Sequence, residues 1–156
     1  MTLRAIPPWR LIVVAIAVAA GASAGAGACT TRSAAPVPRV EVRQSWARIA
    51  DSGATSGAYM EIDNNDTVSI TLVGVTSINA AAAEVHETMQ QDGMVHMMPR
   101  IELPIPAGDV VTMAPGGLHV MLIDLRRALV VGDSVQLRLR FSDSTDVTVT
   151  VPVKTP

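Results

Sequence analysis

The sequence predicts an all-β protein, an antiparallel β-sandwich, and three observations support this. Many short segments alternate apolar and polar residues, which is the pattern of half-buried strands. Turn-forming residues separate these segments about every eight to twelve residues, as in sandwiches and barrels. The core residues available are mainly Val, Ile, Leu and Ala, because aromatic residues make up only 3% of the 156 residues. We expect one domain, since the length suits one and no internal repeat or long amphipathic helix is visible.

The predicted strands follow one another with short connections. Residues 40–49 alternate around Trp46, and the turn Asp51-Ser52-Gly53 comes next. Pro104 and Pro106 argue against a central strand where they stand. Residues 80–83 are compatible with a short helical or irregular connection, and the sequence does not decide between them. The full set of predicted strands is 40–49, 57–62, 69–76, 84–89, 94–98, 109–113, 118–125, 134–141 and 146–153.

The pair of strands at 84–89 and 94–98 is predicted to form a hairpin, because Asp92-Gly93 between such segments is a strong turn signal. A two-residue loop places Thr88 opposite Met97, with His86 diagonal to Met97. A four-residue loop places His86 directly opposite Met97, so both loops put these two side chains on one face. A three-residue loop would separate them.

The N-terminus has the order of a secretory signal peptide. Basic Arg4 and Arg10 precede the apolar residues 11–20, and small residues then lead to Cys29. We expect export, with an uncleaved anchor over residues 11–28 as the alternative. The expected division is a signal peptide at 1–29, a flexible tether at 30–38 and the folded domain at 39–154.

Cys29 is the only cysteine, so no intramolecular disulfide can form. The segment Ala26-Gly27-Ala28-Cys29 resembles a bacterial lipobox, which implies a lipid on Cys29 and attachment to the membrane surface. Ala26 stands where Leu is commonest, so ordinary cleavage stays open. A net charge of −2 without a Lys/Arg run argues against nucleic acid as a partner.

Soft metal donors are concentrated in one stretch, residues 86–121. It holds all three histidines and six of the eight methionines. Imidazole and thioether together favour Cu(I) over hard cations such as Mg²⁺. Any single methionine is also a common core residue, so the prediction depends on shared faces. Strand alternation puts His119 and Met121 on one side of their strand.

If the hairpin and the strand at 118–125 meet, His86, Met97, His119 and Met121 converge into a set of two nitrogens and two sulfurs. This set suits Cu(I) and contains no thiolate, which implies the moderate affinity needed to hand the metal on. The other donors are expected to serve differently. Met60 is assigned to the core, Met89 to packing or the surface, and His96 to the surface, where it can assist capture. Met94, Met98 and Met113 are expected to be apolar filler, or together a soft rim for a partner.

The spacing His-x10-Met-x21-His-x-Met, met by His86, Met97, His119 and Met121, resembles that of the PCuAC family of extracytoplasmic copper chaperones. The resemblance covers about residues 39–154 and includes Trp46-Ala47-Arg48, Gly57-Ala58-Tyr59-Met60, Glu84-Val85-His86-Glu87, Asp92-Gly93 and Pro115-Gly116-Gly117-Leu118-His119-Val120-Met121-Leu122. It implies a cupredoxin-like β-sandwich that binds Cu(I) through those four residues. The implied recipient is a membrane respiratory enzyme, notably the CuA centre of cytochrome c oxidase, or another copper-handling assembly protein.

Two departures from the family are visible. Glu87 follows the first histidine where some relatives have Met, and the chain stops at Val153-Lys154-Thr155-Pro156, without a Met/His-rich tail. A second, tail-based copper site is therefore not expected.

Other functions compete with copper delivery as interpretations of the sequence. A blue-copper protein needs a cysteine thiolate in the domain, and Cys29 lies at the leader junction. A hydrolase needs a nucleophile beside a base, which no motif provides, so no enzyme activity is expected. A non-catalytic adhesion or interaction module, and copper storage without delivery, both remain alternatives.

Overall fold

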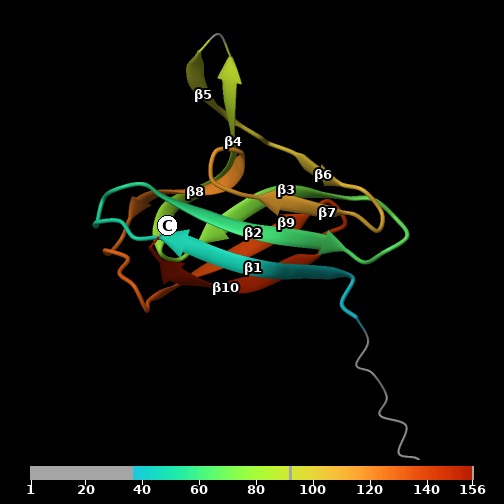
Figure 1. The fold of residues 1–156 in the computed structure, drawn as a ribbon. Coiled ribbons are helices and arrows are strands. Elements are labelled where there is room, and N and C mark those ends of the chain that lie inside the picture. Colours follow the sequence, from blue (N-terminus) through green and yellow to red (C-terminus); the bar gives the residue numbers. More distant parts are fainter. Residues whose placement is uncertain (1–36, 92, 156) are drawn as a thin grey trace, which may run out of the picture. The chain divides into compact units, whose positions relative to one another are not determined.

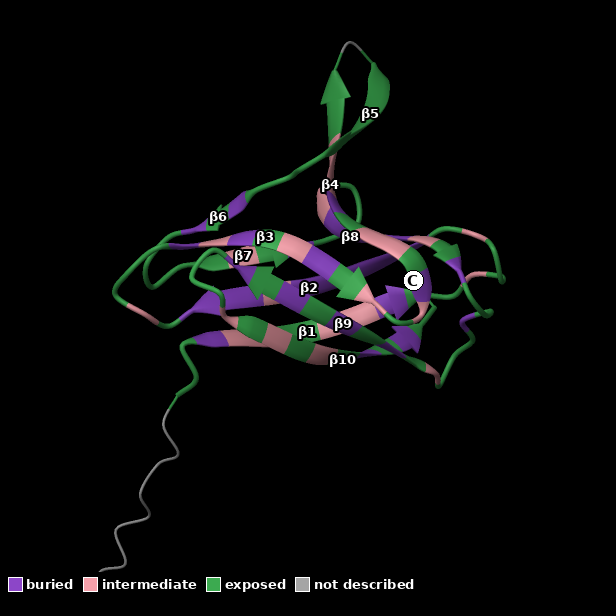
Figure 2. Cartoon of the chain, turned by 180° about the vertical axis from the view of Figure 1, so that it is seen from behind, coloured by how far each residue is buried: buried purple, intermediate pink, exposed green. Residues whose placement is uncertain are grey.

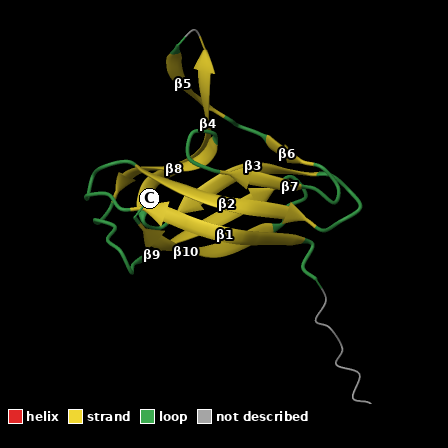
Figure 3. Cartoon of the chain, in the orientation of Figure 1, coloured by secondary structure: helices red, strands yellow, loops and turns green. Residues whose placement is uncertain are grey.

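The computed structural model describes residues 37–91 and 93–155, and within them it contains ten strands and loops (Figure 3). The all-β prediction is confirmed. The predicted signal peptide, Cys29 and nearly all of the tether lie outside the described residues. No helix in the part of the chain that is described is long and apolar enough to cross a membrane. The strands are β1 (Val40–Arg48), β2 (Ser56–Asn64), β3 (Ile70–Ser77), β4 (Ala80–Gln91), β5 (Met94–Pro99), β6 (Leu103–Ile105), β7 (Val110–Met113), β8 (Leu118–Leu125), β9 (Ser134–Phe141) and β10 (Asp146–Lys154).

The sandwich closes on itself into a barrel-like sheet (Figure 1). The strand order is β5-β4-β8-β2-β1-β10-β9-β3-β6, and an additional β3–β4 pairing at Val75 and Ala83 completes the ring. β7 pairs with β2. One pair, β1 with β10, is parallel, so the sheet is not purely antiparallel as the sequence predicted.

The core lies inside this closed sheet and is filled by the inward side of each strand. β9 shows the pattern most clearly, since Val135, Leu137, Leu139 and Phe141 are at most 1% exposed and the residues between them are exposed. Figure 2 shows the same alternation of buried and exposed bands on the body of the domain. Burying one face of each strand fixes its register, because a slip of one residue would turn the apolar set outward.

Two segments differ from the expectations of the sequence. Residues 80–83, which the sequence left undecided, form the start of β4 and pair with β8. β6 was not predicted, but it pairs only with β3 and stands at the end of the strand order. Pro104 is compatible with this edge position because an edge strand does not need every backbone N–H.

The β4–β5 hairpin extends beyond the body of the domain (Figure 1). β4 pairs with β8 up to Glu87, and with β5 from His86 to Gln91. Gln91 pairs with Met94, so the loop has two residues, and Gly93 adopts a φ of 77° that glycine permits. The two-residue alternative is therefore the correct one, and it places Thr88 opposite Met97 with His86 diagonal to Met97.

A β-bulge in β1 changes which way its side chains point. The register with β2 shifts between Arg43 and Trp46, and Gln44 has a φ of 50°. Before the bulge Val40 packs into the core, whereas after it Ala47 does so. Trp46 therefore lies on the outer side of the sheet, although simple alternation from Val40 would have sent it inward.

Candidate metal site

Four rings form a row across adjacent strands on the outer side of the sheet. Trp46 on β1 is opposite Tyr59 on β2, and His86 on β4 is opposite His119 on β8. The ring centroids are 4.5 Å apart for Trp46 and Tyr59, 6.3 Å for Tyr59 and His119, and 6.1 Å for the two histidines. Residues opposite one another on neighbouring strands contact each other directly, so register alone creates this row.

Strand parity explains why the histidines are not in the core. Their neighbours Val85 and Val120 are also paired and point inward, with 7% and 0% of their surface exposed. His86 and His119 therefore point to the opposite side. His119 is nonetheless 6% exposed, so its ring is shielded from water without being part of the apolar core.

A turn before β8 fixes the orientation of the His119 ring. Pro115 and Gly116 form the centre of this turn, in which the Gly117 N–H donates to the Ala114 carbonyl and Gly116 has a φ of 82°. The Gly117 carbonyl then accepts two hydrogen bonds, from Nδ1 of His119 at 3.0 Å and from the Thr88 N–H at 3.1 Å. This tautomer leaves Nε2 of His119 with the lone pair that a metal needs.

Glu84 holds the other histidine. Its Oε2 is 3.1 Å from Nε2 of His86, so that nitrogen donates to the carboxylate. The remaining nitrogen, Nδ1, is buried and has no hydrogen-bond partner within the described part of the chain. An imidazole whose one N–H donates to a carboxylate or a backbone carbonyl is the usual arrangement of a metal ligand, and both histidines have it.

The separation of the two rings is compatible with one shared ion. A metal about 2 Å from a ring nitrogen is about 3.2 Å from the ring centroid, so two rings on opposite sides of one ion have centroids at most about 6.4 Å apart. The observed 6.1 Å lies within this limit.

The two predicted sulfur donors lie around this pair. Met121 is on the same side of β8 as His119, opposite Glu84 of β4 and Gly57 of β2. Met97 lies on β5, diagonal to His86 and 58% exposed. The structure thus brings three of the four predicted residues together on paired barrel strands, and it places the fourth beside them on the projecting hairpin.

The remaining donors separate into buried and exposed groups. Met60 and Met113 are 1% and 3% exposed, so both belong to the core and Met113 is not part of any rim. The expectation that Met94 and Met98 fill apolar space is wrong, because they are 59% and 52% exposed. Met89 and His96 are exposed on the same hairpin, as predicted.

Thioether sulfur is needed if this site holds a metal. Among residues 37–91 and 93–155, no three His, Cys, Asp or Glu side chains are placed to hold an ion. Two imidazoles with methionines nearby fit Cu(I) better than Zn²⁺ or Mg²⁺. The residues present therefore fit copper.

The partners that orient the imidazoles were not predicted from the sequence. Glu84 stands two residues before His86, and Gly117 stands two residues before His119. Residues two apart on a strand share a face, so the sequence could have predicted that the Glu84 carboxylate lies beside His86. The outward position of Trp46 was hidden by the bulge in β1.

The fold and the site define a class: all-β domains with an imidazole pair and thioethers on the outside of a barrel-like sheet. Two solved structures with bound copper resemble the chain. The copper-bound PCuAC domain from PmoF2 matches with a TM-score of 0.64 and 26% identity, over 78% of this chain and 97% of that domain. The Cu(I) form of DR1885 from Deinococcus radiodurans matches with a TM-score of 0.57 and 32% identity, over 73% of this chain and 78% of that one.

The chain belongs to the LpqE-like family, described as "Putative lipoprotein LpqE-like", whose match spans residues 40–153. A relative from Leifsonia xyli subsp. xyli, named "Putative lipoprotein Lxx21020", is 37% identical over 116 residues. That alignment covers 74% of this chain and 69% of the relative.

Proposed function

We propose that this protein is an exported copper chaperone that binds Cu(I) through His86, Met97, His119 and Met121 and passes it to another protein. The main support is the histidine pair, in which the ring centroids are 6.1 Å apart and one nitrogen of each ring is hydrogen-bonded to the protein. The structural neighbours that contain copper support the same metal.

The donor set favours the reduced ion and a moderate affinity. Thioethers are soft ligands and remain neutral, so the site prefers Cu(I) to hard divalent cations. Without a thiolate, the metal is held less strongly than in a cysteine site, which permits transfer. The hydrogen bonds to Glu84 and to the Gly117 carbonyl occupy one nitrogen of each ring and leave the other nitrogen for the metal.

The ligands differ in accessibility, and this gives an order of release. Met97 is 58% exposed on the hairpin, whereas His119 is 6% exposed on a barrel strand. A recipient can replace Met97 first, while His119 and Met121 still hold the ion. Transfer then proceeds by stepwise ligand exchange, so free copper is never released.

The proposed recipient is the CuA centre of cytochrome c oxidase, or another protein that assembles a membrane copper enzyme. This part rests on the resemblance of the four-residue spacing to PCuAC chaperones. A lipid on Cys29 would hold the domain at the membrane surface, near such a recipient, and the lipoprotein description of the family supports that anchor.

The test is a Cu(I) titration of the purified protein under anaerobic conditions against a chromophoric chelator, followed by X-ray absorption. We expect nitrogen and sulfur neighbours, and a loss of affinity of more than about 100-fold in His119→Ala and Met97→Ile. Val95→Ile, on the same face of the same strand as Met97, is the matched control and should bind like wild type. No competitive binding, or equal binding by both variants and wild type, would contradict the proposal.

Delivery requires a separate measurement. The Cu(I)-loaded protein is mixed under anaerobic conditions with the copper-free soluble CuA domain of an oxidase, the two proteins are separated, and the copper bound to each is measured. Rapid, near-stoichiometric transfer supports a chaperone. Retention of copper by this protein would indicate storage instead.

A further inference from the structure

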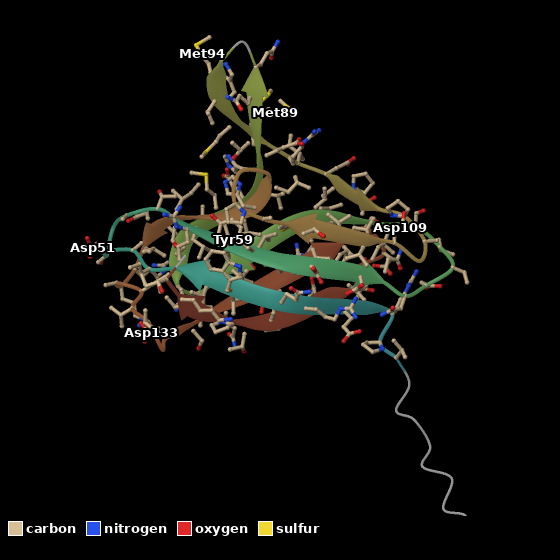
Figure 4. The ribbon with its side chains drawn as sticks, viewed as in Figure 1. Asp51, Tyr59, Met89, Met94, Asp109 and Asp133 are labelled. Atoms are coloured by element: carbon tan, nitrogen blue, oxygen red, sulfur yellow. The ribbon has the colours of Figure 1, made fainter. Side chains whose placement is uncertain are left out.

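The hairpin carries a second group of soft donors on the face opposite Met97. Because residues paired across β4 and β5 share a face, Met89 lies with His96, and Met94 and Met98 lie on the same side of β5. We call this group, Met89, Met94, His96 and Met98, the hairpin back face. His86 and Met97 belong to the other face by the same alternation. Figure 4 shows Met89 and Met94 on the projecting hairpin.

These side chains are exposed, although the sequence assigned some of them to packing. Met89, Met94 and Met98 are 38%, 59% and 52% exposed, and His96 is also exposed. Three thioethers in water around one imidazole contribute little to the stability of the fold. They are free to bind a ligand instead.

Strand geometry limits which donors can share one ion. Met89 is directly opposite His96, with Cβ atoms about 5 Å apart. Met94 and Met98 are each two residues from His96, which is about 7 Å along the strand, but they are about 13 Å from each other. A methionine reaches a metal about 5 Å from its Cβ, given a metal–sulfur bond of about 2.3 Å, so Met94 and Met98 cannot bind the same ion together.

The resulting site has three ligands: His96, Met89, and either Met94 or Met98. Among the described hairpin residues, Glu87 is the only carboxylate on this face, and it is paired with the Arg100 guanidinium at 2.6 Å, so it is not available as a hard ligand. One imidazole with two thioethers selects a soft monovalent ion.

We infer that the hairpin back face is a second Cu(I) site, separate from the site at His86 and His119. Its affinity is lower, because it has three ligands and must immobilise exposed, flexible methionines. It lies on the projecting hairpin, where an incoming ion meets soft donors first. The inference does not require the function proposed above, since the two sites share no ligand.

The experiment is an anaerobic Cu(I) titration of four forms of the full protein: wild type, Met89→Leu with His96→Asn, Met97→Leu with Met121→Leu, and Val95→Leu. Met-to-Leu changes conserve volume, so the fold should persist. We expect two equivalents for wild type and Val95→Leu, a tight one and a weaker one. The first double variant should lose the weak equivalent, and the second should lose the tight one.

Failure of the two ideas can be told apart. One equivalent in wild type that disappears only with Met97→Leu and Met121→Leu overturns the second site and leaves the proposed function intact. One equivalent that disappears only with Met89→Leu and His96→Asn supports the second site and overturns the first. No binding overturns both.

A measurement on the wild-type protein avoids dependence on the variants. Carbon-13 labelled methionine methyl groups are followed by NMR during the titration. The Met97 and Met121 signals should shift with the first equivalent, and the Met89 signal should shift with the second. A Met89 signal that stays unchanged through two equivalents overturns the second site.

Discussion

Replacing Glu84 by alanine should weaken Cu(I) binding about tenfold while leaving the fold intact. Glu84 orients His86 through a 3.1 Å contact to Nε2, which keeps Nδ1 as the basic nitrogen. Loss of such a partner costs about 10- to 100-fold in metal affinity, or about 1.4–2.7 kcal/mol. The Glu84 side chain is 52% exposed, so water replaces part of the contact and the effect should lie near the lower end.

The assay is chelator competition on wild type, Glu84→Ala, Glu84→Gln and Glu87→Ala. The glutamine variant keeps an oxygen that accepts the hydrogen bond and should lose only about threefold, since neutral hydrogen bonds are weaker than charged ones. Glu87 is the matched control because it is on the same strand, points to the other face and pairs with Arg100. Binding by Glu84→Ala within twofold of wild type would refute the reasoning, as would an equal loss in Glu87→Ala.

Three further predictions concern stability. Gly57→Ala should lower the free energy of unfolding by about 1–3 kcal/mol in thermal unfolding, because the new Cβ would lie 2.8 Å from the Tyr59 hydroxyl oxygen. Gly74→Ala should lower it much less, because nothing lies within 4 Å of a Cβ there. Gly116→Ala should lower the free energy of unfolding by about 1–2 kcal/mol, because the φ of Gly116 is 82°. It should also weaken copper binding by disturbing the turn that orients His119. A variant with unchanged Tm would contradict this prediction. Acid should destabilise the protein. Hydrogen bonds from Arg138 or from backbone N–H groups lower the pKa of four aspartates below the ordinary 3.8. The stabilisation from these carboxylates is therefore full above pH 3.8 and is lost as the pH falls through the lowered pKa values. Denaturant midpoints measured from pH 7 to pH 2 should therefore stay level and then drop below about pH 4, and a level profile throughout would argue against the paired carboxylates Asp66, Asp133, Asp143 and Asp146.

Alternation and turn signals were sufficient to predict most of the fold. β9 is an example, since its four inward residues and its flanking turns are visible in the sequence and are buried as expected. The closure of the sheet was not predictable, because the ring depends on pairings between strands far apart in the sequence, such as β3 with β9 and β4 with β8. Such pairings leave no local pattern. The parallel β1–β10 pair was hidden for the same reason.

The candidate site was predictable where it depends on parity within a strand or across a tight turn. His119 and Met121 share a side by period two, and the Asp92-Gly93 loop fixes Met97 diagonal to His86. The direct opposition of His86 and His119 required knowing that β4 pairs with β8. Predicting the outward position of Trp46 required knowledge of the β-bulge in β1. The bulge reverses which side chains of β1 point inward, and no glycine in the sequence marks it.

The donors of the proposed site belong to structures of different rigidity, and this division explains how binding and release can coexist. His119 and Met121 are on β8, which is paired on both sides by β4 and β2, so their positions are fixed by the barrel. Met97 is on β5, the end strand of the sheet, which among the described strands pairs with β4 alone and is exposed along its length. Hydrogen-bonded, buried segments open rarely, whereas exposed edge hairpins open readily. In the proposed site, the fixed half would therefore set the geometry of the bound ion, and the hairpin half would set how fast the ion leaves.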